Sequence, residues 1–197
     1  MTKTVKFYWD IGSTNTYFAF HLLRRLAARY DAHIEYIPFN LGYVFRHHKY
    51  ALTDEPAAKM KNRKVDLMRW ARRYDLPFQV PKEFPIKTSR VARGAMVMAE
   101  LGHEDAFLEA MFHRYWETGD ASIQTYAGMA SSVTELGVDP VEFEQRAEAP
   151  DLRERFVQLT QQALAEGVFG APTLVVDEEI YWGKDRFEFI EDHLKAS

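Results

Sequence analysis

Strand-like patterns occur near the two ends of this chain, and the long stretch between them is helical. A short apolar alternation over residues 5–9 is followed by a helical pattern over 14–30 and a second strand-like run over 33–41. Helical patterns then continue to about residue 166. After them, "PTLVVDEEIYW" has the pattern of two strands joined by an acidic turn, and residues 184–196 form a last helical pattern. Neither end can bury a sheet alone, so each must complete the other.

The order of these elements predicts one four-stranded mixed sheet built from both ends of the chain. A helix connects the first two strands, which favours parallel pairing, whereas the short turn between the last two favours antiparallel pairing. We therefore predict the α/β class, with helices on both faces of the sheet. The arrangement is thioredoxin-like: residues 1–44 and 150–197 form that domain, and residues 45–149 form an inserted all-helical domain.

Composition excludes several kinds of function. Hydrophobic residues make up 47% of the 197, which allows a sizeable core, and the net charge of -4 gives no indication of a nucleic-acid or membrane partner. The chain has no cysteine, which excludes disulfides, thiolate metal sites and a redox thiol of its own. No apolar run has signal-peptide or membrane-spanning character. We therefore expect a cytoplasmic protein without bound metal.

The turn "GSTNT", residues 12–16, is the first candidate site. Serine before a helix is most often a cap, so Ser13 could simply begin the helix over 14–30. The alternative interpretation uses the free N–H groups and partial positive charge of the helix start, which would lower the pKa of a thiol brought there. Ser13 Oγ could then donate a hydrogen bond to the thiolate. Such a thiol would have to belong to a bound molecule.

Two further candidates lie near the C-terminus. In thioredoxin-like folds a proline at the position of Pro172 is cis, and a cis bond would leave the backbone of Ala171 free to pair with an extended peptide. The alternative is a plain trans proline at a strand start. Asp185 could cap the last helix, or it could bind an α-ammonium group with Lys184 near the adjoining carboxylate. A peptide with a γ-glutamyl end would suit the second interpretation.

Three separated segments, "FYWDIGSTNTYFAF", "KVDLMRWA" and "GVFGAPTLVV…WGKDRFEF", together carry a family resemblance. The chain resembles the 2-hydroxychromene-2-carboxylate isomerases and the kappa-class glutathione transferases over essentially its full length. The resemblance implies a homodimer that uses glutathione as cofactor, with Ser13 as the catalytic residue. The family serine is usually followed by proline, where this chain has Thr14. The implied glutathione site comprises Ser13, Thr14, Asn15, Lys59, Ala171, Pro172, Lys184 and Asp185.

The resemblance also implies a reaction, the cis–trans isomerisation of an aromatic pyruvate. Glutathione thiolate would add to a conjugated double bond, the resulting single bond would rotate, and the thiolate would leave. A cation of the basic stretch 46–49 could hold the substrate carboxylate, although that stretch could equally be a solvated loop. The alternatives are a transferase that releases a glutathione conjugate and a non-catalytic glutathione-binding or interaction protein.

Overall fold

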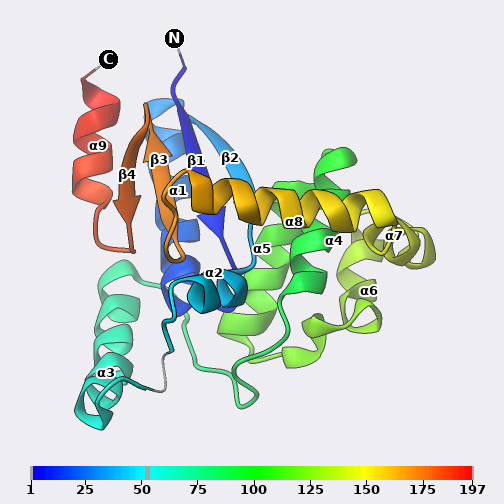
Figure 1. The fold of residues 1–197 in the computed structure, drawn as a ribbon, viewed down its shortest axis with the longest axis horizontal. Helices are drawn as coiled ribbons and strands as arrows, with labels where there is room; N and C mark the ends of the chain where they lie inside the picture. Colours follow the sequence, from blue (N-terminus) through cyan, green and yellow to red (C-terminus); the bar gives the residue numbers. More distant parts are fainter. Residues whose placement is uncertain (1, 52–53, 197) are drawn as a thin grey trace.

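The computed structural model describes residues 2–51 and 54–196, and its centre is one four-stranded sheet (Figure 1). The strand order is β2-β1-β3-β4. β1 pairs in parallel with β2 and antiparallel with β3, and β3 pairs antiparallel with β4. The strands are β1 (Thr4–Trp9), β2 (His33–Pro38), β3 (Thr173–Val176) and β4 (Glu179–Trp182). The predicted mixed sheet, built from both ends of the chain, is confirmed.

Alternation along the strands divides the interior into two cores. On β1, Val5, Phe7 and Trp9 point to one face, where they pack with α1 (Thr14–Tyr30) and α9 (Phe187–Lys195). Tyr8 points to the other face, beneath α2 (Leu41–His47) and α8 (Pro150–Ala165). Figure 1 shows α8 and α2 in front of the sheet and α1 behind it. The sheet is therefore covered on both sides, as the pattern predicts.

The central helices do not all pack in the same way. Buried residues of α4 to α7 belong to the same hydrophobic core as the first face of the sheet, whereas α3 extends away at one end of the molecule (Figure 1). The division into domains at 44/45 and 149/150 stays a prediction. The remaining elements are α3 (Ala57–Tyr74), α4 (Ser89–Glu100), α5 (Glu104–Phe112), the π-helical η2 (His113–Glu117), the 3-10 turn η3 (Ala121–Gln124), α6 (Tyr126–Glu135) and α7 (Pro140–Ala147).

Two element ends differ from the sequence prediction. The second strand was expected to reach residue 41, but it stops at Pro38, which has no N–H for the sheet ladder. Asn40 then begins α2 by accepting a hydrogen bond from the Tyr43 N–H at 2.9 Å. Within the long helical stretch that the sequence predicts, α5 is α-helical only to Phe112, after which the π-helical turn η2 shifts the register.

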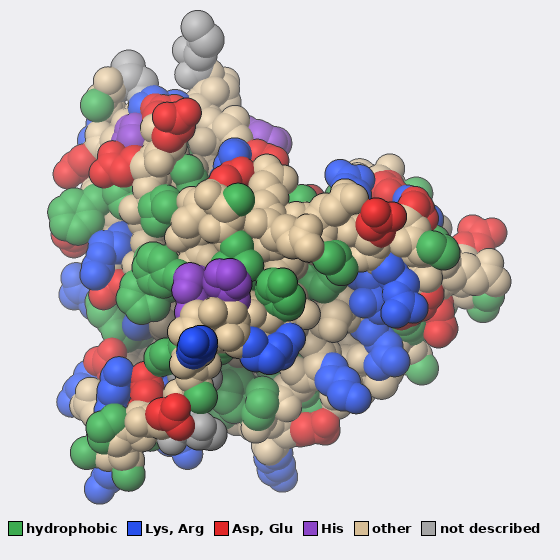
Figure 2. Space-filling view, in the orientation of Figure 1, with side chains coloured by type: hydrophobic (Ala, Val, Ile, Leu, Met, Phe, Trp, Pro, Cys, Tyr) green, Lys and Arg blue, Asp and Glu red, His purple; other side chains and the backbone are tan. Residues whose placement is uncertain are grey.

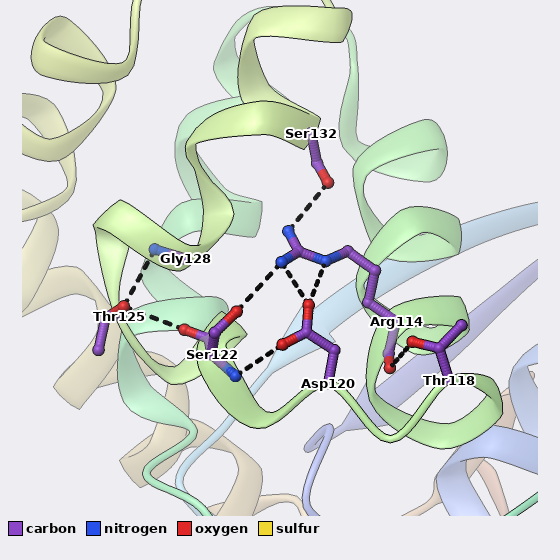
Figure 3. A network of polar contacts seen from close by, with 7 residues as sticks. All are labelled: Arg114, Thr118, Asp120, Ser122, Thr125, Gly128 and Ser132. Atoms are coloured by element: carbon purple, nitrogen blue, oxygen red, sulfur yellow. Dashed lines mark hydrogen bonds and ion pairs between the residues drawn. The ribbon is translucent and has the colours of Figure 1, made fainter.

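A polar network fixes the junction between η2, η3 and α6 (Figure 3). Arg114 Nε donates to Asp120 at 2.9 Å, and Asp120 Oδ1 accepts the Ser122 N–H at 2.9 Å. Thr125 caps α6 by accepting the N–H of Gly128 at 3.0 Å. A Cβ on Gly128 would lie 1.9 Å from the Ser122 carbonyl oxygen, so this approach requires glycine. Among the described residues, no helix is both long and apolar enough to cross a membrane.

Candidate active site

A cleft of about 940 Å³ opens where the start of α1, the end of the loop before β3, α2 and α3 converge. It contains five of the eight residues that the sequence assigned to a glutathione site: Ser13, Thr14, Asn15, Lys59 and Ala171. Further lining comes from apolar and aromatic side chains of α2, of α3, and of the loops before α4 and β3. These are Leu41, Phe45, Met60, Leu67, Val80, Phe84 and Phe169, with Trp182 on β4.

Ser13 occupies the N-cap position of α1 and faces this cleft. Its Oγ accepts the Thr16 N–H at 3.3 Å and donates to the Ala171 carbonyl oxygen at 2.8 Å. The capping interpretation is therefore confirmed. It does not conflict with the second interpretation, since the hydroxyl proton can be redirected from Ala171 to a ligand in the cleft. Donation to a bound thiolate stays a prediction.

The peptide bond between Ala171 and Pro172 is cis, as predicted. The carbonyl of Ala171 is not free, however, because it accepts the hydrogen bond from Ser13. A carbonyl oxygen can accept a second hydrogen bond, so pairing of the Ala171 backbone with an extended peptide stays a prediction. The contact with Ser13 joins residues 158 positions apart in the sequence, and it brings the turn that contains Ser13 beside the cis-proline.

Helix α3 supplies the positive charge of the cleft. Lys59 Nζ lies 2.9 Å from Glu55 Oε1, Arg63 pairs with the same carboxylate, and the Tyr50 hydroxyl donates to it at 2.8 Å. The hydrogen bonds from Lys59 and Tyr50 lower the pKa of Glu55 to about 2. Four cations and one carboxylate therefore line this wall, which makes it suitable for an anion. The four cations are Lys59, Lys61, Arg63 and Lys64.

Glu55 was missed at the sequence level. Its spacing of four residues from Lys59, typical of ion pairs in helices, was the available signal, although Glu55 itself lies two residues before the start of α3. The basic stretch 46–49 lies outside the cleft lining. Figure 2 shows histidine side chains gathered over the end of α2, on the surface of the molecule. No group of three His, Asp or Glu side chains within residues 2–51 and 54–196 is placed to hold a metal ion.

Lys184 and Asp185 also lie outside the residues that line the cleft. The Lys184 ammonium sits 5.1 Å from the centre of the Trp70 ring, and burial lowers its pKa. Asp185 pairs with its neighbour Arg186 at 3.0 Å. The N-cap position of α9 is Arg186, so the interpretation of Asp185 as the capping residue was wrong. Both side chains stand close to α3, and their role toward a ligand stays a prediction.

Two pairs of packed aromatic rings contribute to the cleft lining. Phe169 and Trp182 have ring centres 5.2 Å apart, and Phe45 and Tyr50 have ring centres 5.0 Å apart. All four line the cleft, as does Phe84. By contrast, the aromatic side chains Phe107, Phe112, Tyr115 and Trp116 are buried in the core. The geometry thus combines a helix N-terminus, a serine hydroxyl, a cationic wall and apolar rings in one space.

Comparison with known proteins shows the family of the chain. The family described as the DSBA-like thioredoxin domain matches residues 4–195. The chain belongs to this family. A 2-hydroxychromene-2-carboxylate isomerase from Sphingobium xenophagum is 32% identical, covering 98% of this chain and 99% of that protein. Glutathione s-transferase kappa 2 of Caenorhabditis elegans is 25% identical, covering 98% of this chain and 92% of its own length.

The fold comparison gives the same relationship. The solved structure of SeMet 2-hydroxychromene-2-carboxylate isomerase superposes with a TM-score of 0.87 and 28% sequence identity, covering 98% of this chain and 95% of that one. The resemblance noted from the sequence segments is therefore confirmed. These relatives identify the chain as an enzyme of the isomerase class.

Proposed function

We infer that the chain is a glutathione-dependent cis–trans isomerase of an aromatic pyruvate, of the 2-hydroxychromene-2-carboxylate isomerase kind. The observation that carries this proposal is the position of Ser13, at the start of α1 and in the cleft beside the cis-proline turn. The isomerase relatives support the reaction class, and the kappa transferase relatives support glutathione.

The residues present fit glutathione. When bound, glutathione would supply the thiolate that lets a conjugated double bond rotate, because this chain has no thiol. Ser13 Oγ and the N–H groups at the start of α1 would stabilise that negative charge. Thr14 and Asn15 follow Ser13 at the start of α1, and Lys59 lines the same cleft from α3. Pro172, Lys184 and Asp185 are proposed for the tripeptide backbone and its γ-glutamyl end.

The remaining space fits a flat substrate with one carboxylate. The pairs Phe169–Trp182 and Phe45–Tyr50 both line the cleft and offer ring faces and edges to a flat ligand. The cations of α3 are the carboxylate partners of choice, and Lys61 and Lys64 make no ion pair with other described residues. We place the substrate carboxylate there rather than at the stretch 46–49.

A kappa-like glutathione transferase is the second candidate. The relatives from Caenorhabditis elegans favour it, and the same Ser13 site would serve it. The two activities differ in product, since an isomerase returns glutathione unchanged and a transferase consumes it. A non-catalytic glutathione-binding protein would do neither. A homodimer in the cytoplasm is part of the proposal, and sedimentation equilibrium tests its oligomeric state.

The test of the proposal is Ser13→Ala, assayed with glutathione and 2-hydroxychromene-2-carboxylate. A hydrogen bond to a charged group contributes about 1.5 to 3 kcal/mol. Turnover at neutral pH should therefore fall about 10- to 100-fold. The defect should shrink as the pH approaches about 8.5, where free thiols ionise unaided. The thiolate absorbance of bound glutathione, followed against pH in both proteins, reports the cause directly.

Thr125→Ala is the matched control. It removes a helix cap of the same kind from α6, which costs about 1 kcal/mol of stability, but it lies away from the cleft. Its turnover per folded molecule should equal that of the wild type. If the bound thiol titrates identically in wild type and Ser13→Ala, Ser13 is only a cap and the proposed mechanism is wrong.

A further inference from the structure

The carboxylate of Asp10 is buried at the point where three segments of the cleft wall meet. Its side chain follows β1 and is 5% exposed. Oδ1 accepts the Gly12 N–H at 2.8 Å, and Oδ2 accepts both the Leu41 N–H and the Thr88 hydroxyl at 3.1 Å. One side chain therefore binds the turn before α1, the first residue of α2 and the N-cap position of α4.

Each of these segments brings residues into the cleft. Gly12 immediately precedes Ser13, and both line it. Leu41 lines it from the start of α2. Thr88 ends the loop that contributes Val80 and Phe84 to the cleft lining. Hydrogen bonds to a single carboxylate thus link the turn that carries the serine hydroxyl to two apolar segments of the cleft lining.

Two further hydrogen bonds stabilise the turn that follows Asp10. The Ser13 N–H donates to the Asp10 carbonyl oxygen at 3.1 Å, and Trp116 Nε1 donates to the carbonyl oxygen of Ile11 at 2.8 Å. No ion pair to Asp10 occurs among the residues that the structure describes. Burial raises the pKa of Asp10, and its three hydrogen bonds oppose that shift. A carboxylate buried without a cation is costly, so stability alone does not account for it.

We propose that Asp10 is a positioning residue of the active site, which sets the Ser13 turn against α2 and the loop that ends at Thr88. It does not line the cleft, so it acts through these segments rather than on the substrate. This proposal rests on the proposed function for its kinetic readout. Asp10 thus supports the site indirectly, because the position of Ser13 depends on the hydrogen bonds that fix its turn.

The experiment compares Asp10→Asn with Asp120→Asn. The two aspartates are matched, because each accepts a backbone N–H two residues ahead, from Gly12 at 2.8 Å and from Ser122 at 2.9 Å. Figure 3 shows that the network of Asp120 belongs to η2, η3 and α6. In each variant the new amide cannot accept all the hydrogen bonds of the carboxylate. Stability should fall in both, and only Asp10→Asn should change catalysis.

For Asp10→Asn we expect kcat per folded molecule to fall about 10- to 100-fold, the range that a misplacement near 1 Å produces. The Kd of glutathione, measured by calorimetry, should change by less than about threefold, because Asp10 makes no contact with the cleft. Asp120→Asn should keep both values of the wild type. Equal kcat losses in the two variants, measured well below their melting temperatures, would overturn the proposal.

Thr88→Val covers the case in which Asp10→Asn does not fold. It removes one donor and leaves the carboxylate and its two backbone partners in place. A lowered kcat with unchanged glutathione Kd is expected, and an unchanged kcat would contradict the proposal. Amide hydrogen exchange at Gly12, Leu41 and the start of α4 is independent of the reaction. Faster exchange at these amides in Thr88→Val supports the positioning role, whether or not the wild type is active. A wild type without isomerase activity would refute the proposed function but not the positioning role.

Discussion

Helices α3 and α4 follow each other in the chain, yet they meet the rest of the molecule in opposite ways. α3 has 18 residues and buries only Leu67 and Ala71, whereas α4 has 12 residues and buries seven. In Figure 1, α4 lies within the packed body while α3 stands at its edge. The helical insertion therefore contains two kinds of helix: α4 supports the fold, and α3 forms a wall of the cleft.

Side-chain size and charge explain this difference. α4 contains Gly94, where a Cβ would lie 2.7 Å from the ring of Phe143, so close packing against α7 needs the absence of a side chain. α3 instead exposes apolar side chains such as Val65 and Met68 between its many cations. Figure 2 shows charged side chains of both signs on this part of the surface. The cations of α3 are Lys59, Lys61, Arg63, Lys64, Arg69, Arg72 and Arg73.

The largest expected difference between the two helices is in stability. Met98 on α4 is fully buried, and Met68 on α3 is 42% exposed. Met98→Ala should lower the free energy of unfolding by about 2 to 5 kcal/mol, because it removes buried atoms and leaves a cavity. Met68→Ala should change it by less than about 0.5 kcal/mol. Urea unfolding of both variants measures this, and similar losses would mean that α3 is part of the core.

The fold was predictable from sequence because its signals are local. The helix over 14–30 was predicted at its observed bounds, since a capping serine precedes regularly spaced apolar residues. The alternation on β1 and the acidic turn after β3 likewise determine strands without reference to distant residues. The cis bond at Pro172 followed from the thioredoxin-like topology rather than from the proline itself.

Much of the site was not predictable, because it depends on packing between distant segments. Both α3 and α4 have helical patterns, but the position of α3 over the cleft is determined by few buried side chains, a weak signal. The basic stretch 46–49 was considered as a partner for the substrate carboxylate, or else as a solvated loop, and it lies outside the cleft lining. Asp10 gave no signal at all, since its partners Leu41 and Thr88 lie 31 and 78 residues away. Glu55 had one, its spacing from Lys59.

A smaller effect should appear in substrate binding. Lys64 lines the cleft, and Arg72 is an exposed cation on the same helix that does not. Lys64→Glu should raise KM for an anionic aromatic substrate about tenfold, equivalent to about 1.4 kcal/mol. Arg72→Glu has the same change in net charge and should leave KM within about twofold, because its charge is screened by solvent. Steady-state kinetics at low and high salt measure both, and equal effects would indicate general attraction without a defined carboxylate site.

The smallest effect concerns the Glu55 cluster that begins α3. Its pKa in the folded protein is about 2, below the ordinary value of 4.5, so the carboxylate stabilises the fold above about pH 4.5. That contribution is lost as the pH falls from about 4.5 toward 2. Because the Lys59 side chain is 61% exposed, the loss should stay below about 1 kcal/mol.

In Glu55→Gln, the free energy of unfolding should therefore depend less on pH in the acid range. Near neutral pH, the variant should lose no more stability than the ion pair contributes. Denaturant unfolding across the acid range, in wild type and variant, measures the difference. Added salt should reduce it, since the pair is partly in solvent. The variant also releases Lys59 and Arg63 from their shared carboxylate, so it should bind anionic substrate at least as well as the wild type. A stability loss comparable to that of Met98→Ala would show that α3 is held as firmly as α4, and the contrast between the two helices would then be wrong.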